Sequence, residues 1–200
     1  TRTIAVESPD AEAVIRAVRD LGLGGYTNTS YPRGLAALID DEPARYAVID
    51  AGTNSIKFHI GERDVNGKWR TVVDRAEVTR LGEGLAQQGV IIDVALERAA
   101  ATIAEMADEA KRHGARAIAA VGTAGLRIAS NGIEVVEAIQ ARTGIHIEVI
   151  SGDEETRLAY LAAKAGLGLH QGSLVVFDTG GGSSQFTFGH DAVVDERFSV

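Results

Sequence analysis

The sequence contains no cysteine, which excludes a disulfide framework and any zinc site built from thiolates. It also lacks a run of about 18 apolar residues, the length that a helix needs to cross a bilayer. The first residues do not show the charged-then-apolar order of a signal peptide. Together these absences predict a cytoplasmic protein that does not associate with membranes.

Positive charge is scarce as well. The 200 residues include 20 Lys and Arg against 28 Asp and Glu, for a formal net charge of -8. Because such a chain offers no broad basic face, a bound polyanion must be met by local arginines, backbone amides and metal. We therefore expect no bulk nucleic acid among its partners. Hydrophobic residues make up 45% of the chain, which is usual for a globular protein with a sizeable core.

The most informative motifs are two turns that begin with aspartate and continue with glycine, over residues 50–55 and 178–184. An apolar run typical of a strand precedes each turn. Glycine lets consecutive backbone N–H groups point toward one oxyanion, and the Asn and Ser side chains of these turns add donors. Asp50 and Asp178 offer hard carboxylates to a magnesium ion. The pair of turns therefore predicts a phosphate clamp with a metal beside it.

Hydrophobic periodicity divides the chain into three regions. Residues 1–45 form an N-terminal segment of unknown role, residues 46–171 a first lobe, and residues 172–200 the opening β-meander of a second lobe. In the first region we expect a strand over 3–6 and helical pieces after Pro9 and Pro32. The elements predicted beyond it are strands 46–50, 55–61 and 69–78, helix 93–113, strand 117–121, helix 131–143, strand 145–150, helix 154–165, and strands 174–178, 185–189 and 192–200.

The order of these elements indicates the fold class. A βββαβαβα series followed by a second βββ is an incomplete internal repeat of an α/β lobe. About 28 residues after Gly172 cannot supply the crossover helices that a complete second lobe needs. Strands 46–50 and 117–121 are continuous apolar runs, so we expect both of their faces to be buried.

Five segments occur in a characteristic order along the chain: residues 48–55, 80–85, 122–127 with Asn131 following, 149–158 and 178–184. Together they resemble the exopolyphosphatase and guanosine pentaphosphate phosphatase family, within the actin, hexokinase and Hsp70 superfamily. The resemblance covers residues 46–200 and implies an actin-like ATPase (ribonuclease H-like) lobe plus the start of a second such lobe.

The resemblance implies magnesium-dependent hydrolysis of a terminal phosphoanhydride, in inorganic polyphosphate or guanosine pentaphosphate. Glu155 would orient or deprotonate the attacking water, and Asp50 and Asp178 would hold Mg²⁺ directly or through water. A homodimer is a possible assembly. The phosphate ligands implied by position are Gly52, Thr53, Asn54, Ser55, Arg80, Arg127, Gly180, Gly181, Gly182 and Ser183.

Two positions depart from the family pattern. Gln185 stands where the family usually has a glutamate that supports catalysis, and Lys57 where it has Arg or His. An amide keeps the shape of a carboxylate and loses its charge. If position 185 faces the metal and phosphate, Gln185→Glu is therefore expected to raise phosphate release, mainly in a chain extended through a full second lobe.

Other interpretations stay open at this point. A binding or sensor protein could keep the phosphate clamp without turnover, and a sugar or acetate kinase relative would need an adenosine pocket. Without the resemblance, Glu154 and Glu155 are ordinary acids at a helix start, capped through Ser151 or Asp153.

Overall fold

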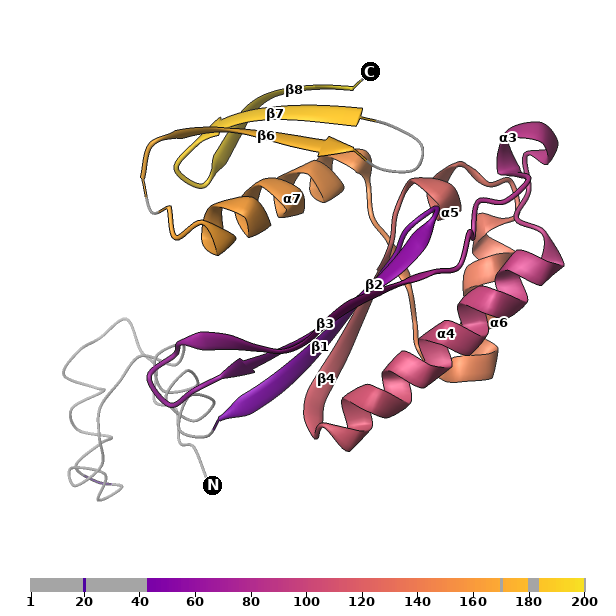
Figure 1. Cartoon of the computed structure of the whole chain (residues 1–200), viewed down its shortest axis with the longest axis horizontal. Helices are drawn as coiled ribbons and strands as arrows, with labels where there is room; N and C mark the ends of the chain where they lie inside the picture. The colour runs from indigo at the N-terminus through magenta and orange to yellow at the C-terminus, as the bar shows by residue number, and fades with distance from the viewer. Residues whose placement is uncertain (1–19, 21–42, 170, 180–183, 200) are drawn as a thin grey trace. The chain divides into compact units, whose positions relative to one another are not determined.

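The computed structural model describes residues 20, 43–169, 171–179 and 184–199, and its elements are labelled as in Figure 1. The predicted order of strands and helices after residue 45 is confirmed, with two short helices added. The elements predicted within residues 3–42 lie outside the described residues. The observed elements are β1 (Ala44–Ala51), β2 (Ser55–Arg63), β3 (Trp69–Val78), α3 (Leu85–Gln88), α4 (Asp93–Arg112), β4 (Ala115–Gly122), α5 (Ala124–Ile128), α6 (Gly132–Thr143), β5 (Glu148–Val149), α7 (Gly152–Gly166), β6 (Ser173–Thr179), β7 (Ser184–His190) and β8 (Val193–Ser199).

The first sheet has five strands in the order β3-β2-β1-β4-β5. The strands β1, β2 and β3 form antiparallel pairs, whereas β4 runs parallel to β1 and β5 parallel to β4. Crossover helices are what allow a parallel pair, and here α4 precedes β4 while α5 and α6 precede β5 (Figure 1). This mixed sheet with its helices is the predicted α/β lobe.

The core of this lobe lies between the sheet and helix α4. Four α4 residues spaced by three or four positions are buried, as the helical period predicts. They belong to one cluster with alternate residues of β1 and β2, such as Ile49 and Phe58. The four residues are Ala99, Ile103, Met106 and Ala110.

The prediction that strands 46–50 and 117–121 are buried on both faces was wrong. Val48 is 42% exposed, and Ala117 and Ala119 are also exposed. Successive strand residues point to opposite faces, and α4 covers one face of β1 and β4. The residues of these runs that point away from α4 are therefore open to solvent in the described part of the chain.

The strand predicted over 145–150 is also shorter than expected. Only Glu148 and Val149 pair with β4. The Ile145 N–H donates instead to the Thr143 hydroxyl, which belongs to the end of α6. Ile147 and Ile150 on either side of this pair are buried, and the Ile150 N–H donates to the Gly122 carbonyl at 3.0 Å.

The second sheet is antiparallel, with order β6-β7-β8, and α7 packs on it. Tyr160 of α7 is fully buried beside Gly189 of β7, where an added Cβ would come within 2.6 Å of the Tyr160 ring. The Val193 carbonyl oxygen would lie even closer, at 2.4 Å, so glycine is required by the approach of both the ring and the neighbouring backbone. Three rings line another part of this sheet, with centroids 4.6 Å apart for Phe177 and Phe186 and 5.0 Å apart for Phe186 and Phe198.

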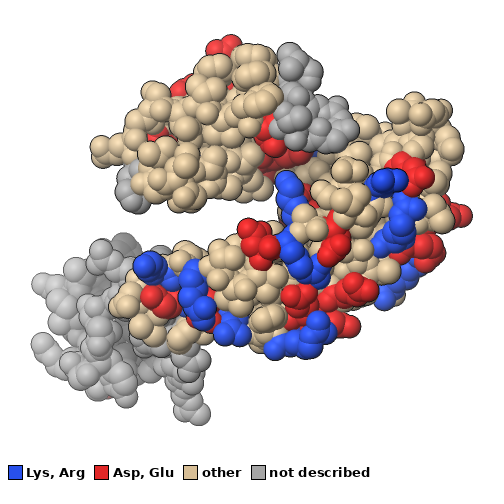
Figure 2. All heavy atoms as spheres, in the orientation of Figure 1, with Lys and Arg blue, Asp and Glu red and all other residues tan. Residues whose placement is uncertain are grey.

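Charged side chains of both signs are interspersed on the face shown in Figure 2, over the region of β3 and α4. One ion pair joins these two elements: Arg75 of β3 lies 2.8 Å from Glu109 of α4. None of the described helices combines the length and the apolar character needed to span a membrane.

Candidate functional site

The turn between β1 and β2 is the meeting point of three motifs. Thr53 lies at its tip, against Gly82 and Gly125. A Cβ added at Gly82 would come within 2.3 Å of Thr53 Cγ2, and one at Gly125 within 3.0 Å of Thr53 Oγ1. The Gly82 N–H also donates to the Thr53 carbonyl at 2.8 Å. A Cβ at Gly82 would therefore clash with Thr53, whereas one at Gly125 would make a tight contact that requires Thr53 to shift slightly.

Part of the predicted phosphate turn is occupied by its own hydrogen bonds. The Gly52 N–H donates to the carbonyls of Asp50 and Ser55, each at 3.1 Å, so this amide shapes the turn. Among the described residues, the N–H groups of Thr53 and Asn54 have no backbone acceptor. These two groups are the main-chain donors that the turn can offer to an anion.

Arg80 follows β3 and lies beside this turn in an unusual backbone conformation. Its φ is 49°, in the left-handed region, which costs a non-glycine residue about 1–2 kcal/mol. The Arg80 N–H donates to the Asn54 carbonyl at 2.8 Å, and Arg98 of α4 donates to the Thr79 carbonyl at 2.9 Å. The Arg80 side chain is exposed, and no described residue pairs with its guanidinium. The strained backbone thus holds an unpaired cation next to the turn.

Asp50 lies near the end of β1, opposite Lys57 of β2. Its Oδ2 is 3.7 Å from Lys57 Nζ, whereas Oδ1 is buried and accepts no hydrogen bond from the described residues. Burial raises the pKa of Asp50, the ion pair with Lys57 opposes that effect, and the charge of Asp178 raises the pKa further.

These carboxylates fit the needs of a magnesium ion. Mg²⁺ prefers carboxylate oxygens and keeps several water or phosphate ligands. Asp50 Oδ1 is a buried oxygen without a donor, which is an energetically costly arrangement unless a cation or water approaches it. The described residues contain no cluster of three or more His, Asp or Glu side chains that would form a complete cage. Asp50 and Asp178 would then be the protein ligands, and the ion itself stays a prediction.

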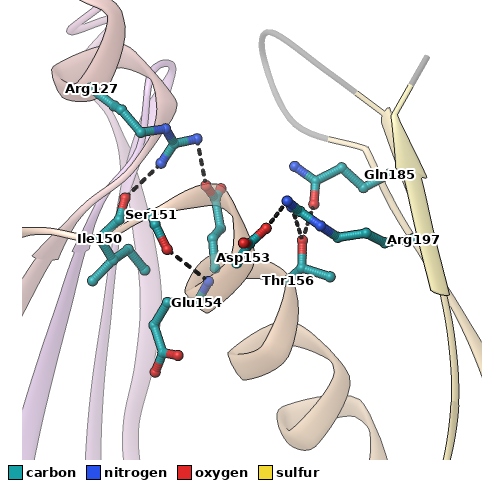
Figure 3. A network of polar contacts seen from close by, with 9 residues as sticks. Arg127, Ile150, Ser151, Asp153, Glu154, Thr156, Gln185 and Arg197 are labelled. Atoms are coloured by element: carbon teal, nitrogen blue, oxygen red, sulfur yellow. Dashed lines mark hydrogen bonds and ion pairs between the residues drawn. The ribbon is translucent and has the colours of Figure 1, made fainter. Parts of the chain in front are cut away.

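Glu155 lies in the first turn of α7, where Arg127 of α5 holds its carboxylate. Arg127 Nη2 is 3.1 Å from Glu155 Oε2, and Arg127 Nη1 donates to the Ile150 carbonyl at 2.8 Å (Figure 3). The carbonyl fixes the guanidinium, and the guanidinium in turn orients the carboxylate. Arg127 was predicted to bind phosphate, and the structure places it as the partner of the predicted catalytic residue.

The neighbouring carboxylate has a different environment. Glu154 pairs with Arg157 at 2.7 Å, within the same helix, and this hydrogen bond lowers the pKa of Glu154. Its N–H donates to the Ser151 side chain at 3.2 Å, so the predicted cap by Ser151 is confirmed. Glu154 is a solvated helix-start acid, and Glu155 alone of the two points to another element.

Gln185 of β7 also points to α7. Its Oε1 accepts a hydrogen bond from Thr156 Oγ1 at 2.8 Å (Figure 3). Arg197 of β8 donates to the same hydroxyl at 3.4 Å and pairs with Asp153. No sequence motif singled out Arg197, because one charged residue in an alternating strand looks like an ordinary exposed side chain.

The structure describes only the beginning and the end of the second glycine turn, residues 178–184. The predicted phosphate ligands Gly180, Gly181, Gly182 and Ser183 lie outside the described residues. The turn's leading Asp178 is exposed at the end of β6 and lies opposite Gln185 in the β6–β7 register. The structure therefore describes Asp178 before these four residues and Gln185 after them. The phosphate-binding role of the four residues stays a prediction.

The model of the Ppx/GppA phosphatase family matches residues 61–200. The chain belongs to this family. Among curated relatives, it is 28% identical over 156 residues to exopolyphosphatase 1 of Mycobacterium leprae, covering 78% of this chain and 46% of that protein. An uncharacterized protein of Streptomyces coelicolor is 32% identical over 152 residues, covering 72% of this chain and 43% of its own length.

Solved structures of Ppx/GppA proteins share the fold. The Aquifex aeolicus family member has a TM-score of 0.70 and 29% identity, over 79% of this chain and 51% of that one. An exopolyphosphatase from Cytophaga hutchinsonii has a TM-score of 0.72 and 28% identity, over 78% and 50%. The predicted family and fold class are confirmed. The chain spans about half the length of these relatives.

Proposed function

We propose that this member of the Ppx/GppA family hydrolyses the terminal phosphoanhydride bond of inorganic polyphosphate, with guanosine pentaphosphate as the alternative substrate of the same bond type. The observation that carries the proposal is the Arg127-held carboxylate of Glu155 in the first turn of α7. A curated relative named exopolyphosphatase supports polyphosphate as the first substrate to test.

The chemistry assigned to this carboxylate is general base catalysis. Arg127 binds Glu155 Oε2, and Oε1 has no partner among the described side chains. A water oriented by Oε1 would attack the terminal phosphorus while its proton passes to Glu155. The new P–O bond forms as the bridging P–O bond breaks, and the shortened chain leaves with the bridging oxygen.

Charge on the phosphates would be met by residues of the β1–β2 turn and its neighbours. No described residue pairs with the Arg80 guanidinium, which can bind phosphate oxygens bidentately. The N–H groups of Thr53 and Asn54, which have no backbone acceptor among the described residues, can donate to the same oxygens. Phosphoryl transfer depends mostly on positioning and electrostatic stabilisation, so few donors are needed besides the base. A magnesium ion held by Asp50 and Asp178 would neutralise further phosphate charge.

The test is phosphate release by the 200-residue chain with polyphosphate, guanosine pentaphosphate and ATP in parallel, each with and without Mg²⁺. We expect release from polyphosphate or guanosine pentaphosphate above that from ATP, and only with the metal. Release from ATP alone would favour a kinase-type relative. Binding of polyphosphate without release from any substrate would favour the sensor alternative and contradict the proposed hydrolysis.

A further inference from the structure

The first turn of α7 is fastened to the second sheet by four side chains, which we call the α7 clamp: Asp153, Thr156, Gln185 and Arg197 (Figure 3). Thr156 is its centre and is only 1% exposed. Its hydroxyl donates to Gln185 Oε1 at 2.8 Å and accepts from Arg197 Nη1 at 3.4 Å, while Arg197 Nη2 pairs with Asp153 Oδ1. The buried Thr156 hydroxyl thus acts as a hydrogen-bond donor toward β7 and as an acceptor from β8.

The clamp acts next to the proposed base. Thr156 directly follows Glu155, and the Glu155 N–H donates to the Ser151 carbonyl at 2.9 Å in the same turn. Arg127 reaches this turn from α5, whereas Gln185 and Arg197 reach it from β7 and β8. The direction of the Glu155 carboxylate therefore depends on two sets of contacts. Arg127 binds the carboxylate itself, and Gln185 and Arg197 hold the adjacent residue, Thr156.

An amide suits position 185 better than a carboxylate. Gln185 lies directly opposite Asp178 in the antiparallel β6–β7 pair, so the two side chains are on one face of the sheet. A glutamate there would place a second negative charge beside Asp178 and would compete with Asp153 for Arg197. The amide oxygen accepts the Thr156 hydrogen bond without adding charge.

We propose that Gln185 and Thr156, with Arg197, are positioning residues for Glu155, and that Gln185 is not a weakened metal ligand. This inference rests on the proposed function, because it concerns the general base of that reaction. It reverses the expectation drawn from the family pattern alone: Gln185→Glu should lower phosphate release, not raise it.

The experiment compares Thr156→Val, which keeps the shape and removes the hydroxyl, with Thr156→Ser, which keeps the hydroxyl. Thr143→Val is the matched control, since Thr143 donates a comparable bond to the Ile139 carbonyl at 2.8 Å in α6. Two quantities are measured: kcat and KM for polyphosphate with Mg²⁺, and hydrogen exchange of the Glu155 amide without substrate.

We expect Thr156→Val to lower kcat about tenfold, the scale set by one buried hydrogen bond, with KM changed by less than about twofold. Exchange of the Glu155 amide should become faster in the same variant. Thr156→Ser should keep kcat and the exchange rate of the Glu155 amide near their wild-type values. Thr143→Val should change neither of them.

Three outcomes would overturn the inference. The first is wild-type kcat in Thr156→Val, and the second is a higher kcat in Gln185→Glu, which would return Gln185 to the metal. The third is unchanged exchange of the Glu155 amide in Thr156→Val. The exchange measurement needs no substrate, so it tests the role of the α7 clamp even if wild-type protein releases no phosphate. Absence of phosphate release would contradict the proposed function and not the clamp.

Discussion

At the scale of single residues, the partly buried carboxylate of Asp50 is expected to lower the stability of the folded protein. One of its oxygens is buried and accepts no hydrogen bond from the residues that the structure describes, and its partner Lys57 is 67% exposed. An exposed ion pair at 3.7 Å contributes little, so the burial of the charge dominates. A residue that destabilises the fold in this way is expected at a site that awaits a cation.

The pH dependence of this effect follows from the raised pKa of Asp50. Between the unfolded value, near about 4, and the higher folded value, the folded state holds more protons than the unfolded state. Stability contributed by protonated Asp50 is fully present below that window and is lost as the pH rises through it. At pH 7 the ionised carboxylate therefore lowers the free energy of unfolding.

Asp50→Asn should consequently raise the melting temperature at pH 7, with the gain shrinking to nothing below about pH 4. Calorimetry or circular dichroism across this range measures it without metal. Asp108→Asn serves as a control, because Asp108 is a 63% exposed carboxylate on α4. An Asp50→Asn protein that melts below wild type at pH 7 would show that the Lys57 pair outweighs burial.

At the scale of elements, the β1–β2 turn depends on glycines that are distant in sequence. Gly82 and Gly125 permit contact with Thr53 from two other segments. Gly166 also lies in a helix, but nothing lies within 4 Å of a Cβ added there. Replacing the glycine hydrogen with a methyl group should therefore cost stability at Gly82, where a side chain is close, and little at Gly166, where the space is open.

We predict that Gly82→Ala lowers the free energy of unfolding by about 1–3 kcal/mol, the usual cost of overpacking. The double variant Gly82→Ala/Thr53→Ser should recover part of this loss, because serine removes the Cγ2 atom that the new methyl meets. Urea unfolding measures both, with Gly166→Ala as a near-neutral control. Equal stability of Gly82→Ala and wild type would contradict the close contact.

Elements with a strong hydrophobic period could be predicted from the sequence, and others could not. Helix α4 carries a buried residue at nearly every third or fourth position, so its extent was predicted closely. Helices α3 and α5 have four and five residues, too few to show a period, and were missed. Exposure of Val48 could not be predicted either, because it depends on which sheet face the helices cover.

The site shows the same division. Asp50 was selected from the glycine turn that follows an apolar run, and Glu155 from the family resemblance, and the roles of both stay predictions. The partners of Glu155 and Gln185 were not predicted, since Arg127 and Thr156 lie 28 and 29 residues away in sequence. Such contacts depend on how helices and strands pack, which no local pattern encodes.

At the scale of the whole molecule, metal and substrate should bind together. As ligands, Asp50 and Asp178 would supply fewer oxygens than an octahedral magnesium shell needs, and we expect substrate phosphate and water to supply the others. We expect Mg²⁺ alone to leave the melting temperature unchanged and Mg²⁺ with polyphosphate to raise it by more than polyphosphate alone. Asp50→Asn should remove the additional shift. Tight binding of Mg²⁺ to the free protein, measured by calorimetry, would contradict this coupling.

The most direct measurement of the proposed chemistry compares phosphate release by Glu155→Gln and Glu154→Gln with that of wild type, using polyphosphate and Mg²⁺. These two carboxylates belong to consecutive residues in the first turn of α7. Arg127 pairs with Glu155, whereas Arg157 pairs with Glu154. We predict that Glu155→Gln loses at least about 100-fold in kcat while binding polyphosphate nearly as well as wild type, since a general base contributes roughly 10²–10⁴. Glu154→Gln should keep most of its activity. More than about a tenth of wild-type turnover in Glu155→Gln would contradict its role as the base.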